Sequence, residues 1–93
     1  MRITERDLEN VITRLNKITN SPETTYRKEN GKLISNVGNY HLSGAYGGWK
    51  LERICNEQGG VTTPIHSGYV SKRELYNLIH SYINGVLSAQ GNN

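Results

Sequence analysis

The segment from Gly38 to Gly60 carries the residues best suited to hold a flat ligand. It contains the only Trp, the only Cys and more than half of the ten glycines of the chain. Glycine lets the backbone approach a ligand closely, and an adjacent aromatic ring offers a face on which a nucleobase can stack. Tyr46, Gly47 and Gly48 combine these two properties, which makes them candidate ligand contacts. Hairpin turns and ordinary sheet packing would explain the same residues without a ligand.

A second candidate is a pair of basic residues, Lys72 and Arg73, which fall in the first turn of an expected helix. The helix dipole already makes that end positive, so cations are mildly unfavourable there unless an anion is bound. A phosphate would find backbone donors and a guanidinium fork together at this point. Arg73 is therefore a candidate phosphate-binding residue, and a solvated surface pair is the alternative.

The remaining reactive residues predict neither a metal centre nor a catalytic site. His41, His66, His80 and Cys55 form no Cys-x-x-Cys, His-Glu-x-x-His or close histidine pair, so no metal site is predicted. His41 and Ser43 have the His-x-Ser form of two-histidine phosphoesterases, but such enzymes need two copies to supply an acid and a base. With one copy and no evident carboxylate pair, the sequence predicts binding without catalysis and without a cofactor.

The chain is small and basic. Its 93 residues predict one domain, 1–93, and a domain of this size buries only about 60–65% of the surface of the extended chain. A formal charge of +3 and a pI near 9.2 favour an anionic partner. The basic residues do not form a block, which argues against nucleic acid and leaves a small anion as an expected partner. A hydrophobic content of 34% without any Phe predicts a thin core, so we expect a homo-oligomer.

The sequence predicts no membrane association and no secreted form. One cysteine cannot form an internal disulfide, and no charged leader followed by an apolar run opens the chain. The longest mostly apolar segment, from Leu75 to Leu87, contains polar residues and is too short to span a bilayer. We therefore expect a cytoplasmic protein in which Cys55 is a small buried side chain.

Two helices are predicted near the ends of the chain. Apolar residues recur at the helical period over about residues 5–19, before Pro22, and over about residues 72–89. Thr4 with Asp7 and Ser71 with Glu74 have the spacing of capping boxes. Residues 90–93 are expected to fray.

Short strands separated by turn residues are predicted between residues 24 and 65. Asn30-Gly31 is a strong hairpin signal, the segment from Gly44 to Gly48 favours a bulge or a tight turn, and Pro64 places the last strand at an edge. The sequence therefore predicts an α+β fold in which a small antiparallel sheet of about four strands is flanked by an N-terminal and a C-terminal helix.

Four segments of the chain resemble a set of small bacteriophage and prophage proteins. These segments are Asn-Tyr-His-Leu-Ser-Gly-Ala-Tyr-Gly-Gly (39–48), Leu-Glu-Arg-Ile (51–54), Asn-Glu-Gln-Gly-Gly-Val (56–61) and Ser-Lys-Arg-Glu-Leu-Tyr (71–76). Many such proteins carry no assigned role, but the pattern is similar to the first-described family of Thoeris anti-defence proteins. Members of that family are phage sponges, which bind cyclic ADP-ribose isomers and keep them from their receptor.

The resemblance implies roles for three residues. In that family an aromatic residue and an asparagine sandwich the adenine, and an arginine near the end of the chain holds phosphate. The matching separations fall on Tyr46, Asn56 and Arg73, with a tyrosine in place of the expected Phe. The resemblance also implies oligomers with pockets at subunit interfaces. For some relatives it implies a second site for cyclic oligonucleotides, which has no identifiable counterpart here.

The expected function is therefore that of a phage immune-evasion sponge in the cytoplasm of the infected bacterial host. It would bind a cyclic nucleotide, either a cyclic ADP-ribose isomer or a cyclic oligonucleotide, without cleaving it. One alternative is a small phage protein that binds nucleic acid or acts as an accessory regulator, using Tyr26, Tyr40, Tyr46 and Trp49 with the scattered basic residues. Another is a weak phosphodiesterase built on His41.

Overall fold

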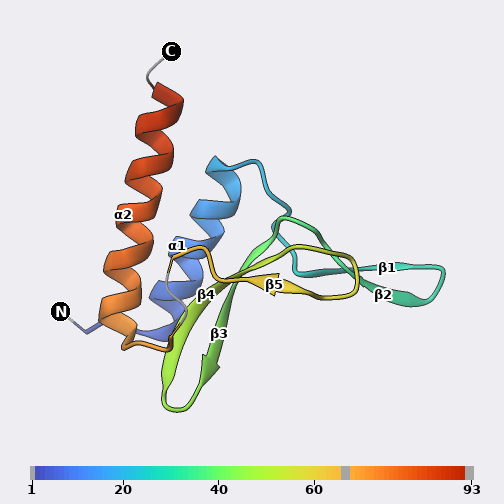
Figure 1. Cartoon of the computed structure of the whole chain (residues 1–93), viewed down its shortest axis with the longest axis horizontal. Coiled ribbons are helices and arrows are strands. Elements are labelled where there is room, and N and C mark those ends of the chain that lie inside the picture. The colour runs from blue at the N-terminus through green and yellow to red at the C-terminus, as the bar shows by residue number, and fades with distance from the viewer. Residues whose placement is uncertain (1, 66–67, 92–93) are drawn as a thin grey trace.

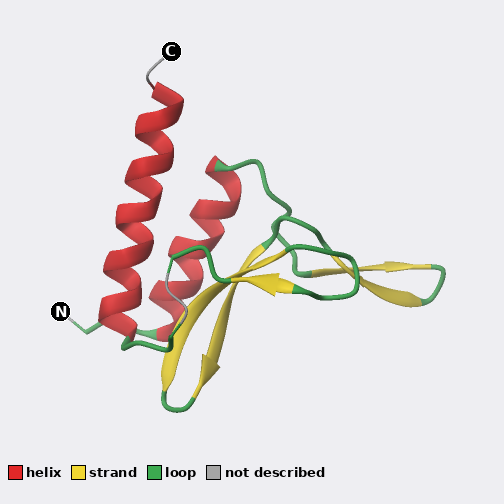
Figure 2. Ribbon diagram, viewed as in Figure 1, coloured by secondary structure: helices red, strands yellow, loops and turns green. Residues whose placement is uncertain are grey.

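Two helices lie beside antiparallel strands in the computed structural model, which describes residues 2–65 and 68–91 (Figures 1 and 2). The elements follow in the order α1 (Glu5–Ile18), β1 (Tyr26–Glu29), β2 (Lys32–Ser35), β3 (Tyr40–Ala45), β4 (Gly48–Ile54), β5 (Val61–Thr62) and α2 (Lys72–Gly91). This order confirms the predicted α+β class and the two terminal helices.

The strands form two sheets, whereas the sequence predicted one sheet of about four strands. Within the described residues β1 pairs with β2, and β4 lies between β3 and β5 in a separate three-stranded sheet. A turn follows β2 and separates it from β3: Nδ2 of Asn36 donates to the carbonyl oxygen of Thr24 at 2.9 Å, and Gly38 adopts a φ of 96°. Residues 26–35 consequently project from the body as a hairpin, which we call the arm (Figure 1).

Both helices begin at the predicted capping residues. Oγ1 of Thr4 accepts from the N–H of Asp7 at 3.2 Å, and Oδ2 of Asp7 accepts from the N–H of Thr4 at 2.8 Å. At the start of α2, Oγ of Ser71 accepts from the N–H of Glu74 at 3.2 Å. These bonds satisfy backbone donors that a helix start leaves free, and they set where each helix begins.

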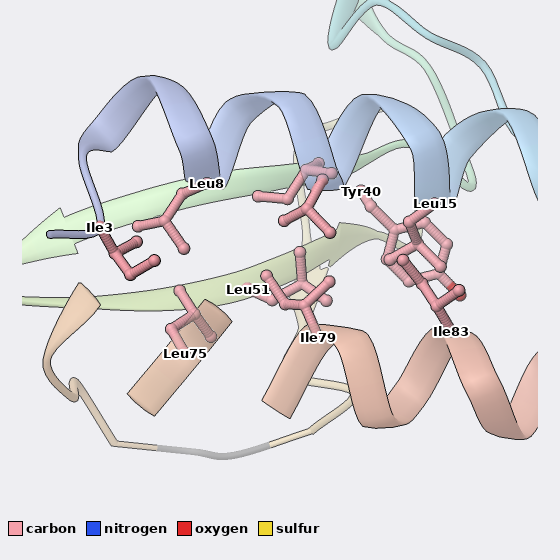
Figure 3. Packing of buried hydrophobic residues seen from close by; sticks show 10 residues of the cluster. Ile3, Leu8, Leu15, Tyr40, Leu51, Leu75, Ile79 and Ile83 are labelled. Carbon is pink, nitrogen blue, oxygen red and sulfur yellow. The ribbon is translucent and has the colours of Figure 1, made fainter. Parts of the chain in front are cut away.

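The hydrophobic core lies between the two helices and the hairpin formed by β3 and β4 (Figure 3). Its most deeply buried apolar side chains, each at most 2% exposed, are Leu8, Leu15, Tyr40, Leu51, Leu75, Ile79 and Ile83. Complete burial of one such aliphatic side chain contributes roughly 1.5–3 kcal/mol. The apolar stripes of α1 and α2 thus hold the hairpin in place, and the turn at its end extends beyond the core.

The C-terminal helix is longer than predicted. It extends to Gly91, two residues beyond the predicted end, while Asn92 and Asn93 lie outside the described residues, and fraying of residues 90–93 stays a prediction. Nε2 of Gln90 donates to the carbonyl oxygen of Ile18 at 2.9 Å, which satisfies an acceptor in the last turn of α1. Over the residues that the structure describes, neither helix is long and apolar enough to cross a bilayer.

A single buried amide joins α1 to the edge of β3. Asn16 is 2% exposed, and its Nδ2 donates to the carbonyl oxygen of Tyr40 at 3.0 Å. Its Oδ1 accepts from the N–H of the same residue at 2.9 Å. The side chain therefore replaces the backbone of a neighbouring strand, and it fixes the position of α1 along the sheet.

The side chain of Tyr40 joins β3 to α2. Its hydroxyl lies 3.0 Å from the hydroxyl of Tyr82, and the two rings meet edge to face with centroids 6.1 Å apart. Burial, followed by the hydrogen bond to Tyr82, raises the pKa of Tyr40 from 10.0 to about 12. The same residue is thus anchored through its backbone to α1 and through its hydroxyl to α2.

Replacing Asn16 with alanine should lower the free energy of unfolding by about 2–4 kcal/mol, because two buried backbone groups of Tyr40 lose their partners. Urea denaturation followed by circular dichroism measures this loss. Arg14→Ala is the matched control on the exposed side of α1 and should shift stability by no more than about 0.5 kcal/mol. Equal stability of the two variants would contradict a structural role for the amide.

The Tyr40 hydroxyl should make stability depend on pH in the alkaline range. Because its pKa is higher in the folded chain, its contribution is complete below pH 10 and is lost as the pH rises toward about 12. Tyr40→Phe should therefore flatten the fall in unfolding free energy over this interval. Tyr26→Phe, at an exposed position of the arm, should leave the slope as it is in the unmodified chain; a slope unchanged by Tyr40→Phe would refute the assignment.

Candidate functional site

The hairpin of β3 and β4 ends in a two-residue turn made by Tyr46 and Gly47. Both residues have positive φ, 55° and 72°, as a type I′ turn requires. Ala45 pairs with Gly48 and closes the hairpin. The tight turn predicted between Gly44 and Gly48 is therefore confirmed.

Tyr46 occupies this turn in an unfavourable backbone conformation. The left-handed region costs a residue with a side chain about 1–2 kcal/mol. The other non-glycine residues with positive φ in the described chain are Asn20 and Asn30, and asparagine tolerates this region. Tyr46 is also 96% exposed, and its ring meets the edge of Tyr69 at a centroid distance of 5.6 Å. The turn thus holds an aromatic ring out in solvent at a cost to the backbone.

Glycines beside the turn allow two aromatic residues to lie close to the strands. A Cβ at Gly44 would stand 2.9 Å from the indole of Trp49, its cross-strand partner. A Cβ at Gly48 would stand 2.9 Å from the Cβ of Tyr69. At Gly44 and Gly48 the backbone therefore approaches residues of the protein itself, as the alternative of ordinary sheet packing expects, and contact of Gly47 and Gly48 with a ligand stays a prediction.

A short backbone pairing brings the start of α2 to this turn. The N–H of Trp49 donates to the carbonyl oxygen of Val70 at 2.8 Å, and the N–H of Val70 donates back at 2.9 Å. Ser71 then caps α2, so its first turn lies beside the hairpin. A pocket of about 440 Å³ results, which we call the turn pocket; it is lined by Gly44, Ala45, Gly47, Gly48, Trp49 and Lys72.

Two lysines lie over aromatic rings around the turn pocket. Nζ of Lys72 lies 5.8 Å from the centroid of the Trp49 ring, and Nζ of Lys50 lies 4.6 Å from that of Tyr69. Such contacts are worth about 0.5–1 kcal/mol at exposed sites. The pocket and its rim therefore combine aromatic faces with positive charge.

Arg73 and Lys72 occupy the first turn of α2, but only Lys72 lines the turn pocket. Arg73 is exposed on the helix surface next to it. Successive helix residues point about 100° apart, so one pocket cannot receive both side chains equally. The sequence places both cations at the helix start and predicts Arg73 as the phosphate contact. Which cation faces the pocket depends on the pairing of Trp49 with Val70, and this pairing has no local sequence signal.

Asn56 lies at the opposite end of β4 from Tyr46. Its Oδ1 accepts from the N–H groups of Gln58 and Gly60 at 3.0 and 2.9 Å, so it shapes the turn before β5. The seven residues of β4 lie between the two positions, and such a strand separates its ends by about 20 Å. Within one chain the structure therefore brings together Tyr46, Gly47, Gly48 and the start of α2, but not Asn56.

His41 and Cys55 lie outside the lining of the turn pocket. Nε2 of His41 lies 3.1 Å from Oε1 of Glu52, and Nζ of Lys50 lies 3.5 Å from Oε2 of the same carboxylate. Cys55 is exposed, so the expectation of a buried side chain is wrong. It directly follows β4 at the start of the turn shaped by Asn56. In the described part of the chain, no three His, Cys, Asp or Glu side chains are grouped to hold a metal ion, and His66 lies outside that part.

Comparison with known proteins adds no relative from which a function could be transferred. No family model matches the chain, and neither a curated protein nor a solved structure matches it. Function must therefore be argued from the geometry of the turn pocket and from the sequence pattern.

Proposed function

We propose that this protein is a non-enzymatic sponge that sequesters a cyclic nucleotide in the turn pocket. The observation that carries the proposal is the meeting of the Trp49 ring, glycine backbone and Lys72 of the helix start in one pocket of about 440 Å³, with the exposed ring of Tyr46 in the adjoining turn. Pockets for small ligands range over about 300–1,000 Å³ and usually combine apolar surface with a few polar groups. The resemblance to Thoeris anti-defence proteins makes a cyclic ADP-ribose isomer the first candidate ligand and a cyclic oligonucleotide the second.

Stacking is the role proposed for Tyr46. Its ring is almost wholly exposed and stands beside the turn glycines, where a nucleobase could approach without meeting a Cβ at Gly47. Base stacking on an aromatic side chain contributes about 1–3 kcal/mol per base. That gain would offset the cost of holding a tyrosine in the left-handed region, which gives the unfavourable turn residue a physical reason.

Phosphate binding is the role proposed for the start of α2. Backbone N–H groups and the helix dipole attract an anion at this end. Lys72 adds a charge inside the pocket and Arg73 adds a second one at its side. A diphosphate has two charged groups, so it could engage both cations while its base lies on Tyr46.

A second copy of the chain is part of the proposal. Asn56 lies a strand length from Tyr46 in the same chain, so it can cover the other face of a stacked base only if another subunit supplies it. The protein is therefore proposed to be a homo-oligomer with pockets at subunit interfaces. Oδ1 of Asn56 is engaged in its own turn, which holds the amide plane in a defined orientation for such a contact.

Retention rather than cleavage is supported by the lining of the turn pocket. Among the described residues its lining consists of glycines, an alanine, a tryptophan and a lysine, which supply contact surface and one charge but no carboxylate or imidazole. A protein that holds a signal molecule without turning it over acts by mass action in the cytoplasm of the infected host. To evade the host defence, such a protein must bind its ligand tightly and be present in large amount.

The purified protein should retain an intact cyclic nucleotide in proportion to its pockets. The experiment mixes it with cyclic ADP-ribose isomers and cyclic oligonucleotides, removes free ligand by filtration, denatures the protein by heat and identifies what is released. Release of the unchanged cyclic molecule is the expected result. A linear product would make the protein an enzyme, and retention of nothing would refute nucleotide binding.

Two substitutions at Tyr46 provide the controls for this capture experiment. Tyr46→Asn creates an Asn-Gly turn, so the chain should stay folded with an unfolding free energy within about 1 kcal/mol of the unmodified protein. Its affinity should nevertheless fall by about 5- to 150-fold because the stacking face is lost. Tyr46→Phe keeps that face and should bind like the unmodified chain.

Removing either cation at the start of α2 should weaken ligand binding measured by calorimetry. Lys72→Ala and Arg73→Ala should each lower affinity by roughly tenfold or more, because a hydrogen bond to a charged group contributes about 1.5–3 kcal/mol. Lys17→Ala, in the last turn of α1, is the control and should bind normally. Full affinity of Arg73→Ala beside a weakened Lys72→Ala would assign the phosphate contact to Lys72 alone, and full affinity of both would remove phosphate binding from α2.

A further inference from the structure

The arm carries apolar surface that the rest of the chain does not cover. Leu33 is 66% exposed and Tyr26 is 53% exposed. The pairing of Lys28 with Leu33 places Tyr26, Lys28 and Leu33 on one face of the arm. Together with Val37 and Val61 near its base, Tyr26 and Leu33 make up four of the six exposed large hydrophobic residues found in the described chain.

Polar contacts at its base hold the arm in a defined direction. Arg27 donates to Oε2 of Glu29 at 2.7 Å, to Oδ1 of Asn36 at 2.8 Å and to Oε2 of Glu57 at 2.7 Å. The last bond ties β1 to the turn between β4 and β5. A two-stranded hairpin is only marginally stable in water by itself. An oriented arm with an uncovered apolar face therefore fits docking against another surface.

A groove between α1 and β3 carries acidic side chains, whereas the arm carries lysines that are unpaired within the described residues. This groove of about 230 Å³, the α1–β3 groove, is lined by ten of the described residues, which include Glu9 and Glu23 and no lysine or arginine. Asn39, which is 1% exposed, also lines it, and its Oδ1 has no hydrogen-bond partner among the described residues. Nδ1 of His41, another lining residue, is buried and equally without a partner there.

Charges at the tip of the arm complement this groove. Lys32 directly follows the Asn30-Gly31 turn and Lys28 lies two residues before it, and neither forms an ion pair within the described residues, whereas Glu29 between them is paired with Arg27. Glu9 and Glu23 likewise lack an ion-pair partner within that part of the chain. The lysines of one arm cannot serve the groove of their own chain, because the arm points away from the body (Figure 1).

We propose that two copies of this chain associate through their arms about a two-fold axis, so that the tip of each arm lies in the α1–β3 groove of its partner. Thr25 and Glu23, which line the groove, come directly before β1 and therefore lie at the base of the arm. An axis through the middle of two antiparallel arms, each about 10–15 Å long, sets every tip against the partner's base. Leu33 and Tyr26 are then covered by the partner arm. The tip enters the groove with Lys28 on that same face and Lys32 on the opposite face, and the two lysines meet the two glutamates from either side.

Exchange of charges tests this arrangement in the ligand-free protein, so its outcome is separate from that of the ligand experiments. Lys28→Glu with Lys32→Glu reverses the tip, and Glu9→Lys with Glu23→Lys reverses the groove. Sedimentation velocity should give the unmodified chain a mass of twice 10.5 kDa or an even multiple of it. Each double variant should self-associate at least about tenfold more weakly, because like charges then meet.

Mixing the two double variants should restore association. The acidic tip of one variant then meets the basic groove of the other, and the basic tip of the second meets the acidic groove of the first. Circular dichroism before mixing checks that both variants are folded. The proposal is overturned if the unmodified chain is a monomer at high micromolar concentration, if either double variant associates as strongly as the unmodified chain, or if the folded variants remain apart when mixed.

Discussion

The amide of Asn16 is the contact on which the placement of the sheet depends. β3 is the outer strand of a three-stranded sheet, so its outward backbone groups need partners, and α1 supplies one side chain that serves both groups of Tyr40. With Tyr40 fixed, its ring enters the core and its hydroxyl meets Tyr82 of α2. The cross-strand register then places Trp49 where Val70 can pair with it, and this pairing brings the start of α2 to the β3–β4 turn. A contact in the core thereby determines the geometry of a pocket at the surface.

The chain forms the same kind of turn twice, and the two turns differ in the residue at their first position. Asn30-Gly31 and Tyr46-Gly47 both place two successive residues at positive φ. The arm uses the asparagine that this backbone favours, whereas the β3–β4 hairpin uses a tyrosine at greater cost. An exposed ring in a strained turn gains little from its own fold beyond its edge contact with Tyr69. Strained residues concentrate where a binding or switching role compensates for them, which supports a ligand for this turn.

Local signals predicted the parts of the fold that local chemistry determines. Features that depend on a few neighbouring residues could be predicted from the sequence. They are the apolar periods of α1 and α2, the caps at Thr4 and Ser71, and both tight turns. The division into two sheets could not be predicted from the sequence, because it depends on which strands pair and not on residues next to one another. The same limit applies to the candidate site. Residue types and the family resemblance selected Tyr46 and the helix start as candidates, but they could not reveal that β4 separates Tyr46 from Asn56 or that Lys72 lines the pocket. Both features depend on contacts between segments that are distant in the sequence.

The two proposed surfaces lie at opposite ends of β4, which constrains the assembly. The turn pocket lies at the start of this strand, while Asn56 and Glu57 follow its end, where Glu57 holds the base of the arm. Pairing through the arms therefore brings the Asn56 of a partner near the two-fold axis, a strand length or more from either Tyr46. An arm-paired dimer cannot by itself cover a base stacked on Tyr46 with a partner's asparagine. If both surfaces act as proposed, the complete pocket needs a further interface, and the assembly that forms it contains more than two chains.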